Sequence, residues 1–245
     1  MVDSLRLYGQ AMLDYLHGGS GRFVFERDDG YRDPANVDVL FAGYRAWPSH
    51  ERRAIRSVRG RVLDIGCGPG RVALYLQRKG LAATGIDSAP EAVECARLCG
   101  VKDARVMDAR RMDFPRHSFD TLVMFGNNLG ICGDFAATRR FLREARGLAG
   151  PRGRLIASTR IPGSWIEAHA EYVRRNVRRG RPPGLVRLRI AYKGKNGSWF
   201  TLLFAGPDDV LRLCNATGWE VVRVLPSRGG ITDFAFVAEG RGSTA

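Results

Sequence analysis

A glycine-rich loop between a short apolar segment and a helix is the feature that most constrains the fold of this chain. Residues 62–65 are apolar except for Asp64, and glycine then recurs at every second position from Gly66 to Gly70. Residues 70–79 follow with apolar side chains at helical spacing. Glycine lets the backbone turn sharply and approach a ligand, and a helix N-terminus directs N–H groups to the same place. The loop therefore predicts a binding site for a ligand that carries an anionic group.

Strand-like and helix-like segments alternate after residue 61. The predicted strands are residues 61–65, 81–86, 104–107, 119–125 and 154–159, separated by predicted helices at 70–79, 88–100 and 134–148. A further helix at 207–217 and two strands at 219–225 and 231–238 complete the pattern. Strands that alternate with helices of this length predict an α/β fold with a doubly wound, mostly parallel sheet of seven strands.

The segments on either side of this core have different patterns. Residues 1–60 are interpreted as a helical segment, and residues 163–179 as a helix. Two alternating segments, 185–192 and 198–204, are predicted to pair as a hairpin. In a chain of 245 residues we expect one domain. Its parts are an N-terminal helical cap (1–60), a ligand-binding core (61–160), an insertion after the fifth strand (161–206) and a closing helix with strands (207–245).

The spacing of the glycines distinguishes between two nucleotide-binding motifs. The dinucleotide motif Gly-x-Gly-x-x-Gly fails, because Arg71 occupies the position of its third glycine. The pattern Asp-x-Gly-x-Gly-x-Gly matches without a gap at Asp64, Gly66, Gly68 and Gly70. In these residues the chain resembles the class I S-adenosylmethionine-dependent methyltransferases, and the resemblance extends over about residues 58–160.

The resemblance implies roles for residues that follow the next three strands. Asp87 would accept the ribose hydroxyls of the cofactor, Asp108 and Ala109 would contact its adenine, and the segment 126–128 would lie beside its methyl group. The expected cofactor contacts are Asp64, Gly66, Cys67, Gly68, Gly70, Asp87, Ser88, Asp108, Ala109 and Asn127. There are alternatives for these residues. Asp87 would then only cap a helix, and Asp108 would lie in a surface turn while Asp113 contacts the adenine. The asparagines after the fourth strand would only form a turn.

Catalytic residues are less evident in the sequence. Methyl transfer from a sulfonium requires mainly alignment and a desolvated site, and a base helps only if the acceptor must lose a proton. The four histidines, at positions 17, 50, 117 and 169, are isolated from one another. The candidates are Asn127 and Asn128, as hydrogen-bonding groups, and His17, in a segment that could cover the pocket.

The chain is strongly basic, with 39 lysines and arginines against 25 acidic residues and a net charge of +14. Residues 139–193 contain 15 of these cations and three acids. One interpretation is a surface that faces RNA or an anionic substrate. The other is a solvated helix face, since Arg174, Arg175, Arg178 and Arg179 fit one side of a helix.

The sequence thus predicts an enzyme that transfers a methyl group from S-adenosylmethionine to a small-molecule acceptor, an anionic one being an option, and releases S-adenosylhomocysteine. The first alternative is methylation of RNA or an RNA-bound protein through the Arg-rich segment 139–193. The second is a non-catalytic regulator that binds S-adenosylmethionine. The chain shows no apolar run of membrane-spanning length, no signal peptide and no metal-ligand spacing among its five cysteines. We therefore expect a cytoplasmic location, no membrane partner and no metal.

Overall fold

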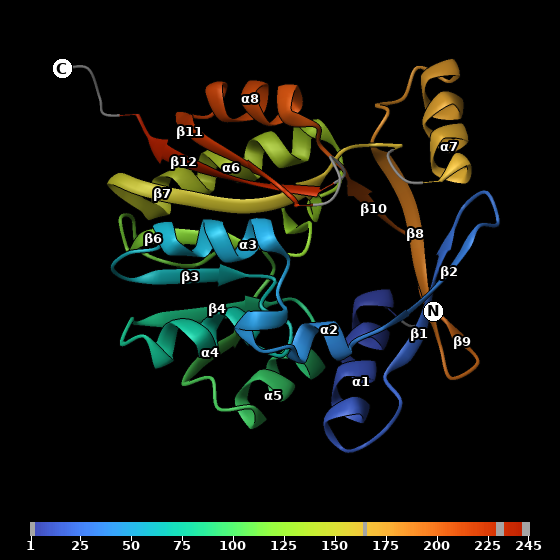
Figure 1. The fold of residues 1–245 in the computed structure, drawn as a ribbon, viewed down its shortest axis with the longest axis horizontal. Helices are drawn as coiled ribbons and strands as arrows, with labels where there is room; N and C mark the ends of the chain where they lie inside the picture. The colour runs from blue at the N-terminus through green and yellow to red at the C-terminus, as the bar shows by residue number, and fades with distance from the viewer. Residues whose placement is uncertain (1–2, 164–165, 229–232, 242–245) are drawn as a thin grey trace. The chain divides into compact units, whose positions relative to one another are not determined.

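The computed structural model describes residues 3–163, 166–228 and 233–241. Its larger sheet has seven strands in the order β11-β12-β7-β6-β3-β4-β5 (Figure 1). These strands are β3 (Val62–Ile65), β4 (Ala83–Asp87), β5 (Asp103–Val106), β6 (Phe119–Met124), β7 (Ala149–Arg160), β11 (Trp219–Pro226) and β12 (Asp233–Gly240). β4 pairs with β5, and β6 with β7, in parallel, whereas β12 is antiparallel to both of its neighbours. The predicted α/β fold with a mostly parallel sheet of seven strands is confirmed.

Helices connect these strands, as their spacing in the sequence predicts. They are α4 (Arg71–Arg78), α5 (Pro90–Leu98), α6 (Phe135–Leu148) and α8 (Pro207–Asn215). Each has an apolar face against the core and a polar face in solvent; on α6, for example, Phe141, Leu142 and Ala145 are buried. None of the helices in the described part of the chain is long and apolar enough to cross a membrane.

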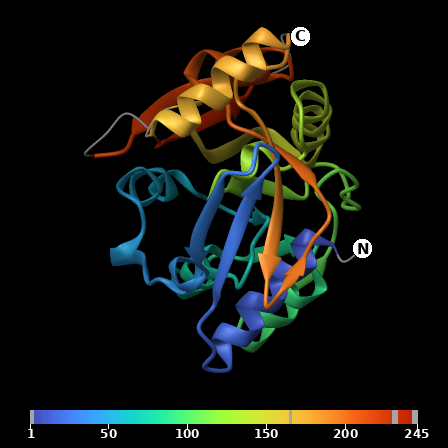
Figure 2. The ribbon, with the colours of Figure 1, turned by 90° about the vertical axis from the view of Figure 1, so that its right-hand side faces the viewer.

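A second, antiparallel sheet has the strand order β10-β8-β1-β2, with β9 paired to β8. Its strands are β1 (Arg22–Arg27), β2 (Arg32–Asn36), β8 (Leu185–Tyr192), β9 (Lys195–Asn196) and β10 (Phe200–Leu203). Figure 2 shows β1 and β2, in blue, side by side with β8, in orange. Two hairpins that are distant in the sequence therefore form one sheet.

The helical interpretation of residues 1–60 is wrong in part. α1 (Ser4–Leu16), α2 (Asp38–Phe41) and α3 (Ser49–Ala54) are helices, but β1 and β2 form a hairpin between α1 and α2. The reason is an alternation of period two: Phe23 and Phe25 lie on one face of β1, where their rings pack against Tyr8 of α1. The hairpin turns at Gly30, which has a φ of +89°.

The chain forms two compact units. The first comprises Met1–Trp47, Asp64–Arg111 and Arg187–Phe200, and the second Pro48–Leu63, Met112–Val186 and Thr201–Ala245. In the first unit α1 packs on α5 at Gly9, where an added Cβ atom would lie 2.9 Å from the Ala92 nitrogen. Because that position has no side chain, the two helices approach closely. A salt bridge of 2.6 Å between Arg6 and Glu91 links the same pair.

The second unit is built around β7, β12 and the helices that cover them. Trp219 at the start of β11 is fully buried, and its indole nitrogen donates a hydrogen bond of 3.0 Å to the Leu142 carbonyl of α6. α7 (Glu167–Arg178) also belongs to this unit. Its Asn176 amide donates to the Pro183 and Leu185 carbonyls, which ties the end of the helix to the start of β8.

Candidate functional site

The glycine loop lies in the first unit, between β3 and α4. Its Gly66 and Cys67 amides both donate to the Ile86 carbonyl of β4, at 2.8 and 3.0 Å. Gly68 and Gly70 have φ values of +53° and +88°, in the left-handed region that favours glycine. At Gly70 a side chain would also collide with Val101. The sequence pattern therefore reflects a tight turn held against the carboxyl end of the neighbouring strand.

Asp87, the last residue of β4, stabilises this loop through hydrogen bonds to its carboxylate. One carboxylate oxygen accepts a hydrogen bond of 3.0 Å from the Gly68 amide, and the other accepts one of 3.0 Å from the Ala89 amide. Burial raises the pKa of Asp87, and its backbone hydrogen bonds oppose that shift. The carboxylate thus joins the loop to the start of α5, and each of its oxygens keeps acceptor capacity for a ligand hydroxyl.

Asp64 and Cys67 lie beneath the loop. Asp64 is 2% exposed, and its carboxylate accepts a hydrogen bond of 3.2 Å from the Ala73 amide, an otherwise unpaired N–H in the first turn of α4. The Cys67 side chain is buried against Gly85 of β4, and burial raises the pKa of its thiol. Both side chains therefore support the loop from within.

The segment after β5 lies beside the end of β4. The Met107 amide donates to the Asp87 carbonyl at 2.9 Å, and the following Ala109 is buried. Asp108 is half-buried and forms an ion pair of 2.6 Å with Arg110, which lowers the pKa of the carboxyl. Ser88, the remaining predicted contact here, is exposed. The structure thus brings together in one unit every predicted cofactor residue except Asn127.

Two residues that the sequence analysis missed border the same loop. Met12 of α1 lies against it, with its sulfur 3.8 Å from a Cβ atom built on Gly68. Tyr8, one turn earlier on α1, is close enough to Asp87 and Arg71 for both charges to act on its phenol. Burial is the largest cause that raises the pKa of this phenol, and it therefore stays protonated. Gly9, a residue without a side chain in the middle of α1, is the signal in the sequence that this helix packs closely on another element.

The other predicted site residue, Asn127, lies in the second unit after β6. It has a φ of +66°, and Asn128 begins a short 3₁₀ helix, Asn128–Gly130. The loop is held by Glu51 of α3, a residue the sequence analysis also missed. Glu51 is 2% exposed, and one of its carboxylate oxygens accepts hydrogen bonds of 2.9 Å from the Gly126 amide and from the Ser158 hydroxyl.

Next to Glu51 lies a buried histidine. His50 is 4% exposed, and its Nδ1 atom has no hydrogen-bond partner in the described part of the chain. Burial lowers its pKa, so the imidazole is neutral at neutral pH. By contrast, the candidate His17 caps the C-terminus of α1 and is exposed. Of these two histidines, His50 is the buried one.

The arginines of α7 are partly neutralised by the helix itself. Arg174 forms ion pairs with Glu167 and Glu171, and Arg178 forms one with Glu171. Arg175 lies over the Tyr172 ring, 4.5 Å from its centroid. This arrangement is typical of a solvated helix face. Among the residues described, no group of three or more His, Cys, Asp or Glu side chains is arranged to hold a metal ion.

Comparisons with known proteins agree with this geometry. Residues 63–157 match the family model "Methyltransferase domain". The chain is 39% identical to the phosphatidylethanolamine N-methyltransferase of Cereibacter sphaeroides over 38% of this chain and 49% of that protein. It is 34% identical to the ubiquinone biosynthesis O-methyltransferase of Azorhizobium caulinodans over 54% of each. The matches thus span about half the length of these curated relatives.

A solved structure resembles nearly the whole chain. The S-adenosylmethionine-dependent methyltransferase from Bacteroides fragilis, in complex with S-adenosylhomocysteine, is 25% identical and has a TM-score of 0.82. The likeness covers 98% of this chain and 97% of that one. Together with the glycine loop and the acid after β4, these likenesses show that residues 63–157 form a methyltransferase domain and that the chain has the fold of the class I S-adenosylmethionine-dependent methyltransferases.

Proposed function

We propose that this protein transfers the methyl group of S-adenosylmethionine to a small-molecule acceptor by direct in-line displacement. The observation that carries the proposal is the pair of hydrogen bonds that the Asp87 carboxylate accepts from the Gly68 and Ala89 amides, which holds this carboxylate at the edge of the glycine loop. The names of the relatives, which include a phospholipid N-methyltransferase and a quinone O-methyltransferase, support an acceptor of this size class.

The residues of the first unit fit the cofactor by their chemistry. A nucleoside with an amino acid chain presents a ribose diol, a purine, a carboxylate and an ammonium group. Asp87 would accept from the diol, the segment 107–109 would border the purine, and the glycine loop from Gly66 to Gly70 would border the amino acid part. Tyr8 and Met12 would cover the bound ligand from α1, and so exclude water from it.

S-adenosylmethionine supplies an activated methyl group with a neutral leaving group, so the protein's work is mainly alignment. We propose that Asn127 and Asn128 contribute hydrogen bonds to the ligands in the second unit. Glu51 would fix the backbone of this loop, and the neutral His50 would take up a proton from an acceptor hydroxyl or ammonium. A carboxylate acceptor would not need this step.

Calorimetric titration with S-adenosylhomocysteine tests the first half of the proposal. We expect saturable binding at one site per chain, and the absence of binding to the folded protein would contradict it. Release of S-adenosylhomocysteine on incubation with S-adenosylmethionine and a panel of metabolites tests the second half. Binding without release across hydroxyl, amine and carboxylate acceptors would instead support the non-catalytic regulator.

A further inference from the structure

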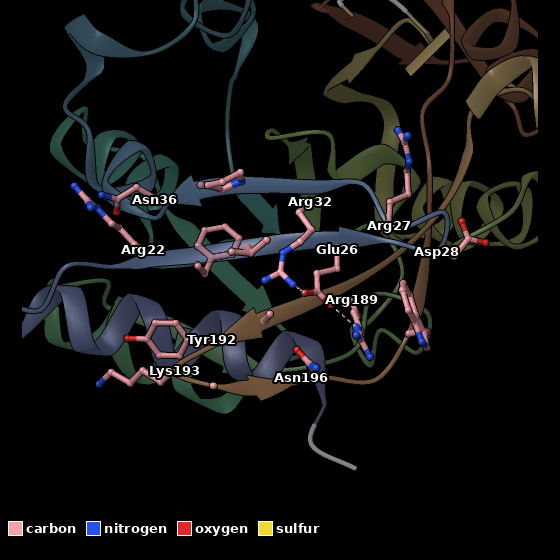
Figure 3. Close-up of a pocket in the computed structure, with 18 residues that line it drawn as sticks. Arg22, Glu26, Arg27, Asp28, Arg32, Asn36, Arg189, Tyr192, Lys193 and Asn196 are labelled. Atoms are coloured by element: carbon pink, nitrogen blue, oxygen red, sulfur yellow. Dashed lines mark hydrogen bonds and ion pairs between the residues drawn. The ribbon is translucent and has the colours of Figure 1, made fainter. Parts of the chain in front are cut away.

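The smaller sheet has two faces of different character. One face packs on α1, where Phe23 and Phe25 contact Tyr8, and Ile190 and Tyr192 join the same apolar cluster. The opposite face borders a hollow of about 920 Å³ (Figure 3). Glu26 of β1 lies on this second face. Because side chains alternate along a strand, the residues two positions before or after Glu26, and those two positions from its partners on β2 and β8, lie on the same face.

The residue pairing across the strands gathers arginines on that face. Glu26 lies directly opposite Arg32 on β2 and Arg189 on β8. Its two carboxylate oxygens are held by Arg32, at 2.6 Å, and by Arg189, at 2.7 Å, as the dashed lines in Figure 3 show. Arg22 on β1 and Arg187 on β8 lie on the same face and are exposed. One glutamate among four arginines leaves an excess of three positive charges.

The other charges near the hollow lower this excess by one, to two, because Asp28 also lines the hollow. The Arg27 side chain is 5% exposed and pairs with Asp29, and Lys193 pairs with Asp14 of α1, so both cations are balanced. Asp28 lies at the end of the hollow where β1 turns. The side chain of Arg32 is 62% exposed, so its charged group lies at the rim of the hollow within reach of a ligand.

Polar and aromatic groups accompany the arginines. Trp199 is half-buried at the hollow, with the guanidinium carbons of Arg189 and Arg187 at 4.8 and 5.5 Å from its ring centroid. Asn36 and Asn196, from β2 and β9, line the hollow as well and provide both hydrogen-bond donors and acceptors. An aromatic ring, amide groups and guanidinium groups on an exposed sheet face are the components that proteins use to bind single strands of nucleic acid.

We propose that this hollow and the sheet face beside it bind single-stranded nucleic acid, with a base on Trp199 and phosphates on Arg22 and Arg32, which line the hollow, and on Arg187, which lies beside it next to Trp199. Guanidinium groups bind phosphate bidentately, and an aromatic ring and amides suit the faces and edges of bases. An acidic polypeptide would satisfy the charge, but it would leave the tryptophan and the asparagines without a specific role. The surface lies on the side of the sheet opposite α1, and the inference does not depend on which acceptor is methylated.

Fluorescence anisotropy of a labelled oligo-uridylate, measured with the full chain at several salt concentrations, tests the proposal. We expect binding at ~50 mM salt that weakens steeply towards ~200 mM. The triple variant Arg22→Gln, Arg32→Gln, Arg187→Gln should bind at least about tenfold more weakly. Its log–log salt slope should be smaller by about 2, because three phosphate contacts are lost at roughly 0.7 each.

The matched control removes the same number of positive charges from another surface. It replaces Arg139, Arg140 and Arg143, which are exposed on α6, by glutamine. It should lower affinity much less than the triple variant, and equal losses would show a response to net charge alone and overturn the proposal. Trp199→Leu should weaken binding about 5-fold or more, since one stacked base contributes ~1–3 kcal/mol. Unchanged S-adenosylhomocysteine affinity in each variant shows that the fold is intact.

Competition by polyglutamate distinguishes a nucleic acid partner from an acidic polypeptide. At equal charge concentration it should displace the oligonucleotide poorly from wild-type protein. Displacement as effective as that by unlabelled oligo-uridylate would assign the hollow to an acidic polypeptide and overturn the proposal. Absence of oligonucleotide binding by the wild-type protein at ~50 mM salt would overturn it as well.

Discussion

Replacing Asp87 by asparagine tests how the glycine loop is held and what the held loop binds. The carboxylate accepts one hydrogen bond from the Gly68 amide and one from the Ala89 amide, each 3.0 Å long. Asparagine has only one acceptor oxygen, so its NH₂ group faces one of these two N–H donors. A buried donor left without an acceptor costs about 1–3 kcal/mol. We expect the free energy of unfolding of the variant to fall by this amount.

The same substitution should weaken cofactor binding. In the proposed site the carboxylate would also accept the ribose hydroxyls, and a hydrogen bond to a charged group contributes about 1.5–3 kcal/mol. Since 1.4 kcal/mol corresponds to a factor of ten, the dissociation constant of S-adenosylhomocysteine should rise about 10- to 100-fold. Calorimetric titration measures the affinity, and urea unfolding measures the stability.

Asp103→Asn is the matched control for this experiment. Asp103 lies at the start of β5, where it accepts a hydrogen bond of 2.8 Å from the Thr84 hydroxyl and pairs with Arg105. The parallel register places it at the opposite end of the strand pair from Asp87. The control should therefore lose some stability and keep wild-type affinity. If Asp87→Asn bound S-adenosylhomocysteine like the wild type, or both variants weakened it equally, the ribose assignment would be refuted.

Three further substitutions probe α1 and α3. Tyr8→Phe should weaken S-adenosylhomocysteine binding about 3- to 10-fold, because it removes one hydroxyl near Asp87, whereas the control Tyr15→Phe on the same helix should not weaken it. Equal affinities of the two variants in a calorimetric titration would show that the Tyr8 hydroxyl does not contribute to binding. The pKa of Asp14 is lowered to about 2, first by the hydrogen bond that its carboxylate accepts from Lys193, so this contact stabilises the fold above pH ~4 by about 1 kcal/mol and is lost as the pH falls towards 2. Acid unfolding of Asp14→Asn should lack this pH-dependent loss of stability, and a profile like that of the wild type would contradict the prediction. Glu51→Ala should lower the free energy of unfolding by about 2 kcal/mol, because the amide and the hydroxyl that donate to this carboxylate stay buried without an acceptor. Wild-type stability of the variant in urea would show that the loop does not need Glu51.

The parts of the molecule that the sequence predicted depend on local signals. The order of β3, the glycine loop and α4 follows from a run of apolar residues, the glycine spacing and helical periodicity within about 20 residues. The alternation of strands and helices then leads to the parallel sheet through general rules of connection. The predicted cofactor residues rest on the same kind of signal, because each lies at the end of a strand or in the loop that follows it.

The remaining parts depend on contacts between distant segments. Glu26 and Arg189 are neighbours in the small sheet but are separated by 163 positions in the chain, and no local pattern reports such a pairing. The approach of Met12 to Gly68 depends in the same way on how α1 packs. Glu51 occurs in a short, charged sequence that resembles an exposed helix, and only its three-dimensional surroundings show that the carboxylate is buried. Long-range packing, rather than propensity, thus decides where these polar groups act.

The central claim is methyl transfer to a small molecule, and a labelling experiment tests it most directly. The protein is incubated with S-adenosylmethionine tritiated in its methyl group and with a cell extract, which is then separated into metabolites and macromolecules. We predict that the label enters the metabolite fraction with wild-type protein and much less with Asp87→Asn. Label confined to RNA or protein, or no transfer by wild-type protein that binds S-adenosylhomocysteine, would contradict the claim.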